Sequence, residues 1–539
     1  MMEPFESTVD VTAETYRRQR EGMLDLVAQV RMLEARVRAA SAKARPKFDA
    51  RKQILPRERV ARLLDHGTPF LELATLAGYR QDEDDPDKTI PGGGSIIGIG
   101  YVSGVRCIIV ASDSGITAAA RPGGQKAVRA QHIALQSRLP LVNLVESGGA
   151  NLRDYQMEHF VYGGEMFFNM AKLSAAGVPV ISAVHGNCTA GGAYIPGMSD
   201  YVIMVRGRGK AFLAGAPLVK AATGEDADEQ SLGGAEMHAT ISGLAEYLAE
   251  DDADAIRLTR EVMAALDWSR DRPITEPEHA EEPRYDPDEL CGVVPLDYRK
   301  PYDMREVAAR IADGSRWSDF KPLYGSDMVC LRATVGGYAC GFIGNNGPIT
   351  PNGATKCAQF IQLCCQTRTP LVFLTNTTGY VVGTDPEQGG MIKHGSKMIQ
   401  AVSNATVPRI TFNIGASFGA GNYGMCGRAY KPHFLFAWPN AHMNVMGGEQ
   451  AATTMSIVVE ASMKRRGMEM DPTMLAAMKQ EIVDLFNRQE DALYATARGL
   501  DDGIIDPRDT RRVLTYVLSI CAEAERRTMH PNTFGVARQ

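Results

Sequence analysis

The feature that most constrains the fold of this chain is an internal duplication. SRLPLVNLVESGG in the first half corresponds to TRTPLVFLTNTTG in the second, and LSAAGVPVISAVHGNCTAGGAY corresponds to VSNATVPRITFNIGASFGAGNY. Four anchor pairs recur at a nearly constant offset along the chain: Pro140 and Pro370, Gly149 and Gly379, Pro179 and Pro408, and Gly192 and Gly421. Similarity at a nearly fixed offset indicates that the chain contains two copies of one fold.

Each copy alternates short apolar runs with helical stretches, which is typical of an α/β fold. The first copy contains the strand-like runs IIGIGYVSG, RCIIVAS, LVNLVES, VPVISAVHG and YVIMV, with helices expected over 126–137 and 165–176. An amphipathic helix is expected before them, over 12–43. Residues 268–300 are charged and proline-rich, which predicts a linker between domains 1–285 and 300–539.

Composition excludes several classes of function. The 539 residues are too many for one ordinary core, and a net charge of −6 argues against nucleic acid as the partner. No apolar run reaches the ~18 residues of a membrane span, and the start MMEPFESTVD lacks the features of a signal peptide. The ten cysteines form no CxxC pair and the ten histidines show no ligand spacing. We therefore expect a cytoplasmic protein without a metal site and without a membrane segment.

The glycine-rich turns carry the chemical signal. Each copy has two places where a strand ends in small residues and a helix begins: 147–150 and 189–193 in the first copy, and 377–379 and 418–422 in the second. Backbone amide groups are free at the start of a helix, and glycine lets a ligand approach them closely. Two such turns aimed at one point form an oxyanion hole. The alternative is that these glycines only allow a strand and a helix to pack closely. The recurrence of both turns at a nearly fixed offset argues against this alternative.

No conventional nucleophile motif competes with the glycine turns. The chain contains no GxSxG, HExxH or Walker motif, and PGGGSIIGIG leads into a strand rather than a helix. His185, His238 and His394 are interpreted as structural or rim residues. Glu449 is either a helix cap or a charge for the site, and Lys220 is either a phosphate contact or a solvated lysine. Both alternatives remain open.

Two oxyanion holes without a side-chain base suit enolate chemistry on a thioester, because charge develops on the carbonyl oxygen when the α-carbon loses its proton. The second hole implies a second oxyanion, and the base then comes from a partner or a cofactor. Three alternatives are a crotonase-type hydratase or isomerase, a biotin-dependent decarboxylase, and a scaffold with degenerate holes. The hydratase would need a positioned pair of glutamates and leaves the second hole unexplained.

Five segments resemble the carboxyltransferase (beta) subunits of biotin-dependent acyl-CoA carboxylases: CTAGGAYIPGMSD, FLAGAPLVKAATGE, FIQLCCQTRTPLVFLTNTTGY, SFGAGNYGMCGRAY and WPNAHMNVMGGEQAA. The resemblance runs from about residue 15 to the C-terminus, and implies tandem crotonase-like domains. It is strongest to the 3-methylcrotonyl-CoA and geranyl-CoA branch rather than the propionyl-CoA branch.

The resemblance also implies a mechanism and a set of site residues. Carboxybiotin, carried on a separate subunit, delivers CO2, and its ureido nitrogen accepts the substrate proton. The amides of Gly191 and Gly192 would hold the thioester enolate, and those of Ala420 and Gly421 the ureido oxyanion. Further residues implied are, for the acyl-CoA, Gly148, Gly149, Ala150, Ala190, Ala193 and Gly164, and, for biotin, Thr378, Gly379, Gly419 and Asn422. Biotin carboxylase and biotin carrier partners and a hexamer built from dimers, with the two holes meeting between chains, are implied as well.

The acyl group is the least determined part of this prediction. Between Gly149 and Phe167 the chain reads ANLRDYQMEHFVYGGEMF, which departs from the more acidic, proline-containing stretch expected of methylcrotonyl enzymes. Gly163 and Gly164 would leave room there for a branched or longer acyl chain, such as geranyl. The alternatives are that these glycines only start the following helix, and that the substrate is a saturated short- or medium-chain acyl-CoA.

Overall fold

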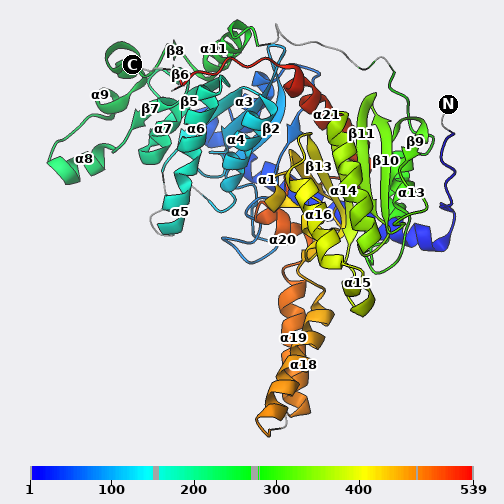
Figure 1. Cartoon of the computed structure of the whole chain (residues 1–539). Helices are drawn as coiled ribbons and strands as arrows, with labels where there is room; N and C mark the ends of the chain where they lie inside the picture. The colour runs from blue at the N-terminus through cyan, green and yellow to red at the C-terminus, as the bar shows by residue number, and fades with distance from the viewer. Residues whose placement is uncertain are drawn as a thin grey trace. The chain divides into compact units, whose positions relative to one another are not determined.

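Two compact units make up the chain (Figure 1). The computed structural model describes residues 3–119, 121–149, 157–268, 277, 279–468, 471–533 and 535–536. We call N-half unit the set Arg31–Ile274, Ala497–Gly499 and Ile520–Gln539, and C-half unit the set Met1–Val30, Thr275–Thr496 and Leu500–Ser519. Each unit contains one sequence copy and one mixed sheet, so the predicted α/β class and duplication are confirmed. The functional boundaries 1–285 and 300–539 stay a prediction.

The N-half unit is built on an eight-stranded sheet with the order β1-β2-β3-β4-β5-β6-β8, in which β7 also pairs with β5. The pairs β1–β2 and β2–β3 are antiparallel, and the strands from β3 onward are parallel. The strands are β1 (Leu71–Glu72), β2 (Ser95–Val102), β3 (Val105–Ser112), β4 (Leu141–Ser147), β5 (Val180–Thr189), β6 (Tyr201–Val205), β7 (Lys210–Phe212) and β8 (Tyr247–Ala249).

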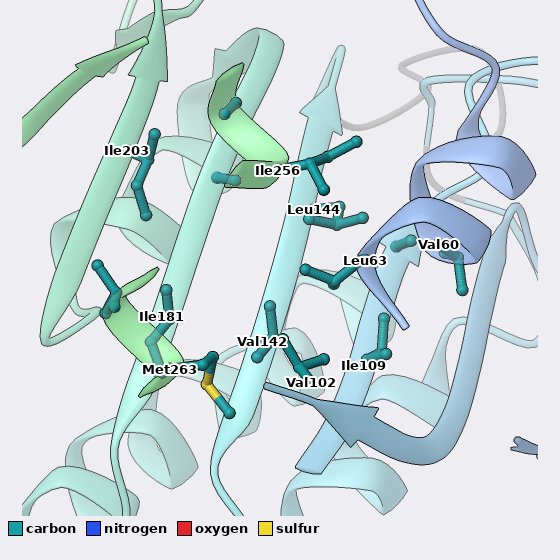
Figure 2. Packing of buried hydrophobic residues seen from close by; sticks show 14 of the residues in the cluster. Val60, Leu63, Val102, Ile109, Val142, Leu144, Ile181, Ile203, Ile256 and Met263 are labelled. Carbon is teal, nitrogen blue, oxygen red and sulfur yellow. The ribbon is translucent and has the colours of Figure 1, made fainter. Parts of the chain in front are cut away.

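Helices α3 (Pro56–Leu63) and α11 (Asp252–Ala265) bury the main core of the N-half unit. Their apolar side chains, among them Leu63 and Met263, pack against Val142 and Ile181 of the sheet (Figure 2). The helices predicted over 126–137 and 165–176 are confirmed as α4 (Gln125–Ser137) and α6 (Glu165–Ala175). Shorter helices are α2 (Arg45–Ala50), α5 (Met157–Gly163), α7 (Tyr194–Gly197), α8 (Ala216–Thr223), α9 (Glu229–Gly233) and α10 (Ala235–Met237).

The C-half unit repeats this plan with seven strands in the order β14-β13-β12-β11-β10-β9, and β15 pairs with β13. The strands are β9 (Trp317–Asp319), β10 (Met328–Val335), β11 (Tyr338–Asn345), β12 (Leu371–Thr377), β13 (Arg409–Phe418), β14 (Phe434–Ala437) and β15 (His442–Asn444). The helices are α12 (Leu290–Val293), α13 (Met304–Ala309), α14 (Pro351–Gln366), α15 (Thr384–Gln388), α16 (Met391–Ser403), α17 (Gly421–Gly424), α18 (Gly448–Arg465), α19 (Pro472–Asn487) and α20 (Ala492–Ala497). Phe360 of α14, Met398 of α16 and Phe373 of β12 share the core of this unit.

The predicted N-terminal helix is α1 (Glu14–Ala42), which buries Met23, Val27, Leu33 and Val37 at helical spacing. A second long helix near the C-terminus is α21 (Thr510–Arg526). In the segment expected to be a linker, residues 269–276 and 278 lie outside the described residues, and Leu290 is buried in the C-half unit. Within the described part of the chain, no helix is long and apolar enough to cross a bilayer.

The backbone of the two copies agrees in detail. The ladder between β4 and β5 loses its register between Val145 and Ser147, and the ladder between β12 and β13 does so at the equivalent place, between Thr375 and Thr377. Arg138 and Arg368, which lie just after the ends of α4 and α14, have the same left-handed φ of 53°. The copies therefore share the irregular features of the fold as well as the regular ones.

The copies differ most in a helical arm. The stretch from the end of β7 at Phe212 to the isolated bridge at Gly234 is less than half as long as the stretch from the end of β15 at Asn444 to the bridge at Asp491. The longer stretch forms the paired helices α18 and α19, which stand off the rest of the C-half unit (Figure 1). Ile457 and Met474, on this arm, are 61% and 65% exposed.

Each copy also buries a lysine at the same place. Lys126 Nζ donates to the carbonyl of Ser95 at 2.6 Å, and Lys356 Nζ, its counterpart in the second copy, donates to that of Met328 at 2.9 Å. Ser95 and Met328 are the first residues of β2 and β10. Each lysine therefore ties a helix to the start of the first long strand of its sheet. Burial lowers the pKa of Lys126 to about 8.

This lysine gives the N-half unit a specific pH dependence. Between about pH 8 and the ordinary lysine pKa of 10.5, the unfolded chain keeps a proton that the folded chain has lost, so stability rises with pH. Lys126→Met should remove this rise. The free energy of unfolding of the wild type should therefore exceed that of the variant by ~2 kcal/mol more at pH 9.5 than at pH 7. Urea unfolding at both pH values measures this. The exposed Lys220→Met is the control, and the same pH dependence in Lys126→Met and the wild type would contradict the assignment.

Candidate active site

In the N-half unit two strand ends lie side by side. Ser147, the last residue of β4, pairs with Cys188 near the end of β5. The chain then leaves β4 through Gly148 and Gly149, and leaves β5 through a 3₁₀ turn at Ala190–Ala193 that runs into α7. Parallel neighbours bring their carboxyl ends to one edge of a sheet. The two turns predicted from the sequence are thus neighbours in space.

Gly192 is required where these turns meet. A methyl group on Gly192 would lie 2.7 Å from Ser147 Oγ and 2.8 Å from Ser147 Cβ. The first two amide groups of a 3₁₀ helix, here those of Ala190 and Gly191, have no acceptor within the helix. The nearest atom to a side chain added at Gly191 is Cζ of Phe167, at 3.7 Å. Among the described residues, the Gly191 amide thus has no acceptor and lies beside an aromatic ring, and Gly192 provides the space.

The other predicted residues of this turn shape it. The amide of Gly148 donates to the carbonyl of Ala118 at 2.8 Å, and that of Gly149 donates to Ser147 Oγ at 3.3 Å. Ala193 lies in the 3₁₀ turn, whereas Ala150 lies outside the described residues. Gly164 is the residue before α6, as in the alternative that it only starts a helix, and an added methyl group there would meet no atom closer than 3.4 Å.

The C-half unit repeats the arrangement at the ends of β12 and β13. Thr377 pairs with Ser417, and a methyl group on Gly421 would lie 2.8 Å from Gly379 Cα and 3.0 Å from Thr377 Cγ2. Gly379, with φ +117°, donates its amide to Thr377 Oγ1 at 3.2 Å, as Gly149 does to Ser147. Ala420 precedes α17, and in the described structure no acceptor contacts the amides of Ala420 and Gly421.

The remaining predicted residues of the C-half turn support its backbone. The amide of Gly419 donates to the carbonyl of Asn444 at 2.9 Å. Asn422 Nδ2 donates to Ser417 Oγ at 2.8 Å, and the Asn422 carbonyl accepts from Gly427 at 2.8 Å. Thr378 lies between Thr377 and Gly379 in the turn that follows β12. The structure therefore gathers Thr378, Gly379, Gly419, Ala420, Gly421 and Asn422 at one end of the sheet.

The polar residues singled out in the sequence have partners away from the turns. His238 lies between the Ala211 carbonyl and Ser242 Oγ, both at 2.7 Å, and His394 Nδ1 lies 2.7 Å from Thr355 Oγ1. Lys220 forms an exposed ion pair with Asp226 at 2.6 Å, which favours the solvated-lysine alternative. Glu449 is in the first turn of α18 with its side chain 86% exposed. Over the described ranges, no three His, Cys, Asp or Glu side chains are grouped as metal ligands.

Comparison with known proteins decides the family. The sequence pattern of the family described as Carboxyl transferase domain matches residues 49–536. The chain belongs to this carboxyltransferase family. It is the carboxyltransferase (beta) subunit type of the biotin-dependent acyl-CoA carboxylases, which settles the choice against the hydratase and scaffold alternatives.

Three relatives show how close the similarity is. The beta subunit of P. aeruginosa geranyl-CoA carboxylase is 52% identical, with a TM-score of 0.93 and coverage of 100% of both chains. The "Probable biotin-dependent acyl-coenzyme A carboxylase beta2 subunit" of Mycobacterium tuberculosis is 48% identical over 99% of this chain and 100% of its own. The biotin-dependent 3-methylcrotonyl-coenzyme A carboxylase beta1 subunit of the same organism is 46% identical over 93% and 94%. The resemblance inferred from the motifs is thereby confirmed.

Sequence reasoning missed a buried charged group behind the N-half turn of this carboxyltransferase. Arg59, Glu146, His185 and Asp252 are all at most 9% exposed and contact one another. They come from α3, β4, β5 and α11, so no spacing in the sequence links them. The one available signal was Glu146 directly before the SGG turn, at a position where an apolar residue would be expected in a buried strand.

The C-half turn can be tested by a single methyl group. Gly421→Ala places a Cβ against the backbone of Gly379, which cannot rotate away, so the two turns must separate. Loss of an aligned oxyanion donor costs about 10²–10³ in rate, and we expect a loss of that size in carboxylation kcat. Gly347→Ala, where a Cβ meets no atom within 4 Å, is the matched control in the same unit. Full activity in Gly421→Ala would show that the close approach is not needed.

Proposed function

We propose that this subunit transfers the carboxyl group of carboxybiotin to a branched enoyl-CoA, geranyl-CoA or 3-methylcrotonyl-CoA, with the thioester at the N-half turn and biotin at the C-half turn. The observation that carries the proposal is the pair of glycine turns repeated in both units, each with amides at a helix start that have no acceptor among the described residues. The relatives named for geranyl-CoA and 3-methylcrotonyl-CoA, at 52% and 46% identity, support the choice of acyl group.

At the N-half turn the chain stabilises charge on the thioester oxygen. When the acceptor carbon loses its proton, negative charge moves to this oxygen, and an amide already oriented toward it lowers the barrier. Gly191 supplies this amide from the second position of the 3₁₀ turn, and the partial positive charge of a helix start adds to it. Because Gly192 has no side chain, the thioester carbonyl has room to approach the turn, and Ser147 can pack directly against it.

At the C-half turn the amides of Ala420 and Gly421 hold the ureido oxygen. The structure fits such a group, because these two donors lack acceptors among the described residues while their neighbours Gly379 and Gly419 are anchored. Carboxybiotin, when bound, supplies both the carboxyl group and the base that takes the substrate proton. The residues of this chain orient and stabilise charge, which is consistent with the absence of a nucleophile motif in its sequence.

Apolar side chains on α5 and α6, the helices that follow β4 in the chain, suit an apolar acyl chain. Phe160 and Tyr162 of α5 are each 75% exposed, and Phe168 of α6 is 62% exposed. Phe167 packs edge-on against Tyr194 with ring centroids 5.7 Å apart and also lies nearest to Gly191. Exposed apolar groups of this size mark sites where apolar ligands or partners bind. The alternative substrate is a saturated short- or medium-chain acyl-CoA, because the name of the relative at 48% identity specifies no acyl group.

The remaining parts of the proposal concern partners and setting. As a beta-type subunit the chain needs a partner that carries the biotin, and we propose a biotin carboxylase and carrier subunit with a dimer-built homohexamer of this chain. We also propose a cytoplasmic location. All ten cysteines are free thiols and nine of them are buried, as expected in a reducing compartment.

The proposal is tested by a carboxylation assay over a panel of acyl-CoAs with the biotin-carrying partner. We expect turnover with geranyl-CoA or 3-methylcrotonyl-CoA, and Gly192→Val should reduce it by about 10²–10³ while carboxybiotin is still consumed in the absence of acyl-CoA. Gly197→Val, in a position open for 4 Å around its Cβ, is the control. Preference for a saturated acyl-CoA would establish the alternative substrate, and unchanged carboxylation by Gly192→Val would overturn the N-half assignment.

The acyl pocket has its own test in Gly164→Phe. If the space at Gly164 receives the distal part of the acyl chain, the phenyl ring should lower long-chain turnover about 10–200-fold, as apolar pockets discriminate by ~1–3 kcal/mol per methylene-sized difference. Short-chain turnover should survive. The short-chain substrates, measured on the same variant, are the internal control. A parallel loss for all chain lengths, or none, would place the pocket elsewhere.

A further inference from the structure

The turn at the end of β4 begins at an interruption of the sheet. Val145 pairs with Val184 and Ser147 with Cys188, so Glu146 alone faces the longer segment 185–187 of β5. Such a bulge loses ladder hydrogen bonds and re-aims the strand that follows it. Some other interaction must therefore fix the direction in which the Ser147–Gly149 turn leaves the sheet.

In the C-half unit a neutral side chain fixes the direction of the equivalent turn. Asn376, the counterpart of Glu146 in the second copy, accepts a hydrogen bond on Oδ1 from the amide of Ala416 at 2.9 Å. This bond bridges β12 and β13 inside the interruption, in place of the lost ladder bond. A methyl group at the facing Gly415 would lie 2.4 Å from Asn376 Oδ1, so the side chain fills the gap.

The N-half unit uses charge at the same position. Glu146 Oε2 lies 3.0 Å from Arg59 Nη1 and also accepts from Ser114 Oγ, and Oε1 lies 3.4 Å from Gln53 Nε2. A methyl group on the facing Gly186 would lie 2.8 Å from Glu146 Oε1. The bulge is thus held from α3 through Arg59, where the second copy holds it from β13.

A second carboxylate completes this buried group. Asp252 Oδ2 accepts from Arg59 Nη2 at 3.0 Å and from the amide of Ile54 at 2.7 Å, and Oδ1 lies 3.0 Å from His185 Nδ1. Burial and the charge of Arg59 lower the pKa of His185. Burial alone would raise the pKa of Asp252, but the hydrogen bond from His185 and the charge of Arg59 bring it to about 2. Arg59 therefore lies between the carboxylates of Glu146 and Asp252, each 3.0 Å from one of its terminal nitrogens, and has little freedom to move.

We propose that Glu146 and Arg59 are positioning residues for the thioester oxyanion hole, acting through Ser147 on Gly192. The path is short, because Glu146 is bonded to Ser147, whose Cβ lies 2.8 Å from the point where a Cβ of Gly192 would be. The C-half unit holds its turn through the neutral Asn376 instead, whose Oδ1 accepts from the amide of Ala416. The inference rests on the proposed function of the N-half turn as the acyl-CoA side.

The test is Glu146→Gln in the holoenzyme with the biotin-carrying partner. Gln keeps the shape and removes the charge that holds Arg59, so the hole should lose alignment while the acyl-CoA site stays formed. Misplacement by a fraction of an ångström to 1 Å costs up to about 10²-fold, and we expect kcat to fall about 10–100-fold. The Kd of the acyl-CoA, measured by calorimetry, should stay within about 2-fold, since only an interaction of the transition state is lost. Glu146→Asp, which keeps the charge, should recover part of kcat.

The matched control is Glu523→Gln, which removes an equally buried carboxylate of the same unit that lies 3.3 Å from Arg106 Nη1 and 2.7 Å from Arg527 Nη2. It should lower the Tm by a similar amount and leave kcat unchanged. The inference is overturned if Glu146→Gln keeps full kcat, if the two variants lose kcat in parallel, or if Asp does no better than Gln. Failure of the proposed function itself is recognised separately, by Gly192→Val retaining full carboxylation.

Discussion

The close approach of two parallel strand ends is the constraint on which both sites depend. At Gly192 and Gly421 the next turn lies so near that a single methyl group would stand less than 3.0 Å from another atom, Ser147 Cβ in one copy and Gly379 Cα in the other. Only because these positions lack a Cβ can two helix starts sit beside two strand exits. The sheet order, with β4 beside β5 and β12 beside β13, serves to bring these ends together.

Under the proposed function, duplication of this arrangement lets one fold serve two ligands. The proposed donors are backbone amides, which every residue carries, so the side chains around each turn could diverge without removing them. Glu146 and His185 in the first copy correspond to Asn376 and Ile414 in the second. The two copies thus differ in the side chains that support the turns and agree in the backbone groups that would contact the ligands.

The duplicated fold and the positions of the glycine turns could be predicted from the sequence. The features that could not be predicted were missed for physical reasons. The fixed offset between Gly192 and Gly421 placed the turns, because glycine spacing records a backbone requirement directly. The charged group behind the N-half turn escaped notice, since Arg59, Glu146 and Asp252 are distant in sequence and meet only through tertiary packing. The assignment of Gly164 rested on a pair of glycines that both begin a helix and leave space, and sequence cannot separate those two roles.

The interleaved composition of the two units has a consequence for how the chain is made. The C-half unit contains Met1–Val30, where Gly22 packs against Leu296, as well as Leu500–Ser519. The N-half unit includes Ile520–Gln539, which supplies Glu523 to Arg106 and a carbonyl at His530 that leaves no room for a side chain at Gly177. Neither unit can therefore complete its core before the segments that follow Leu500 leave the ribosome. During synthesis the apolar strands of both sheets therefore stay partly exposed until the last segment of the chain is made, and exposed strands of this kind promote aggregation.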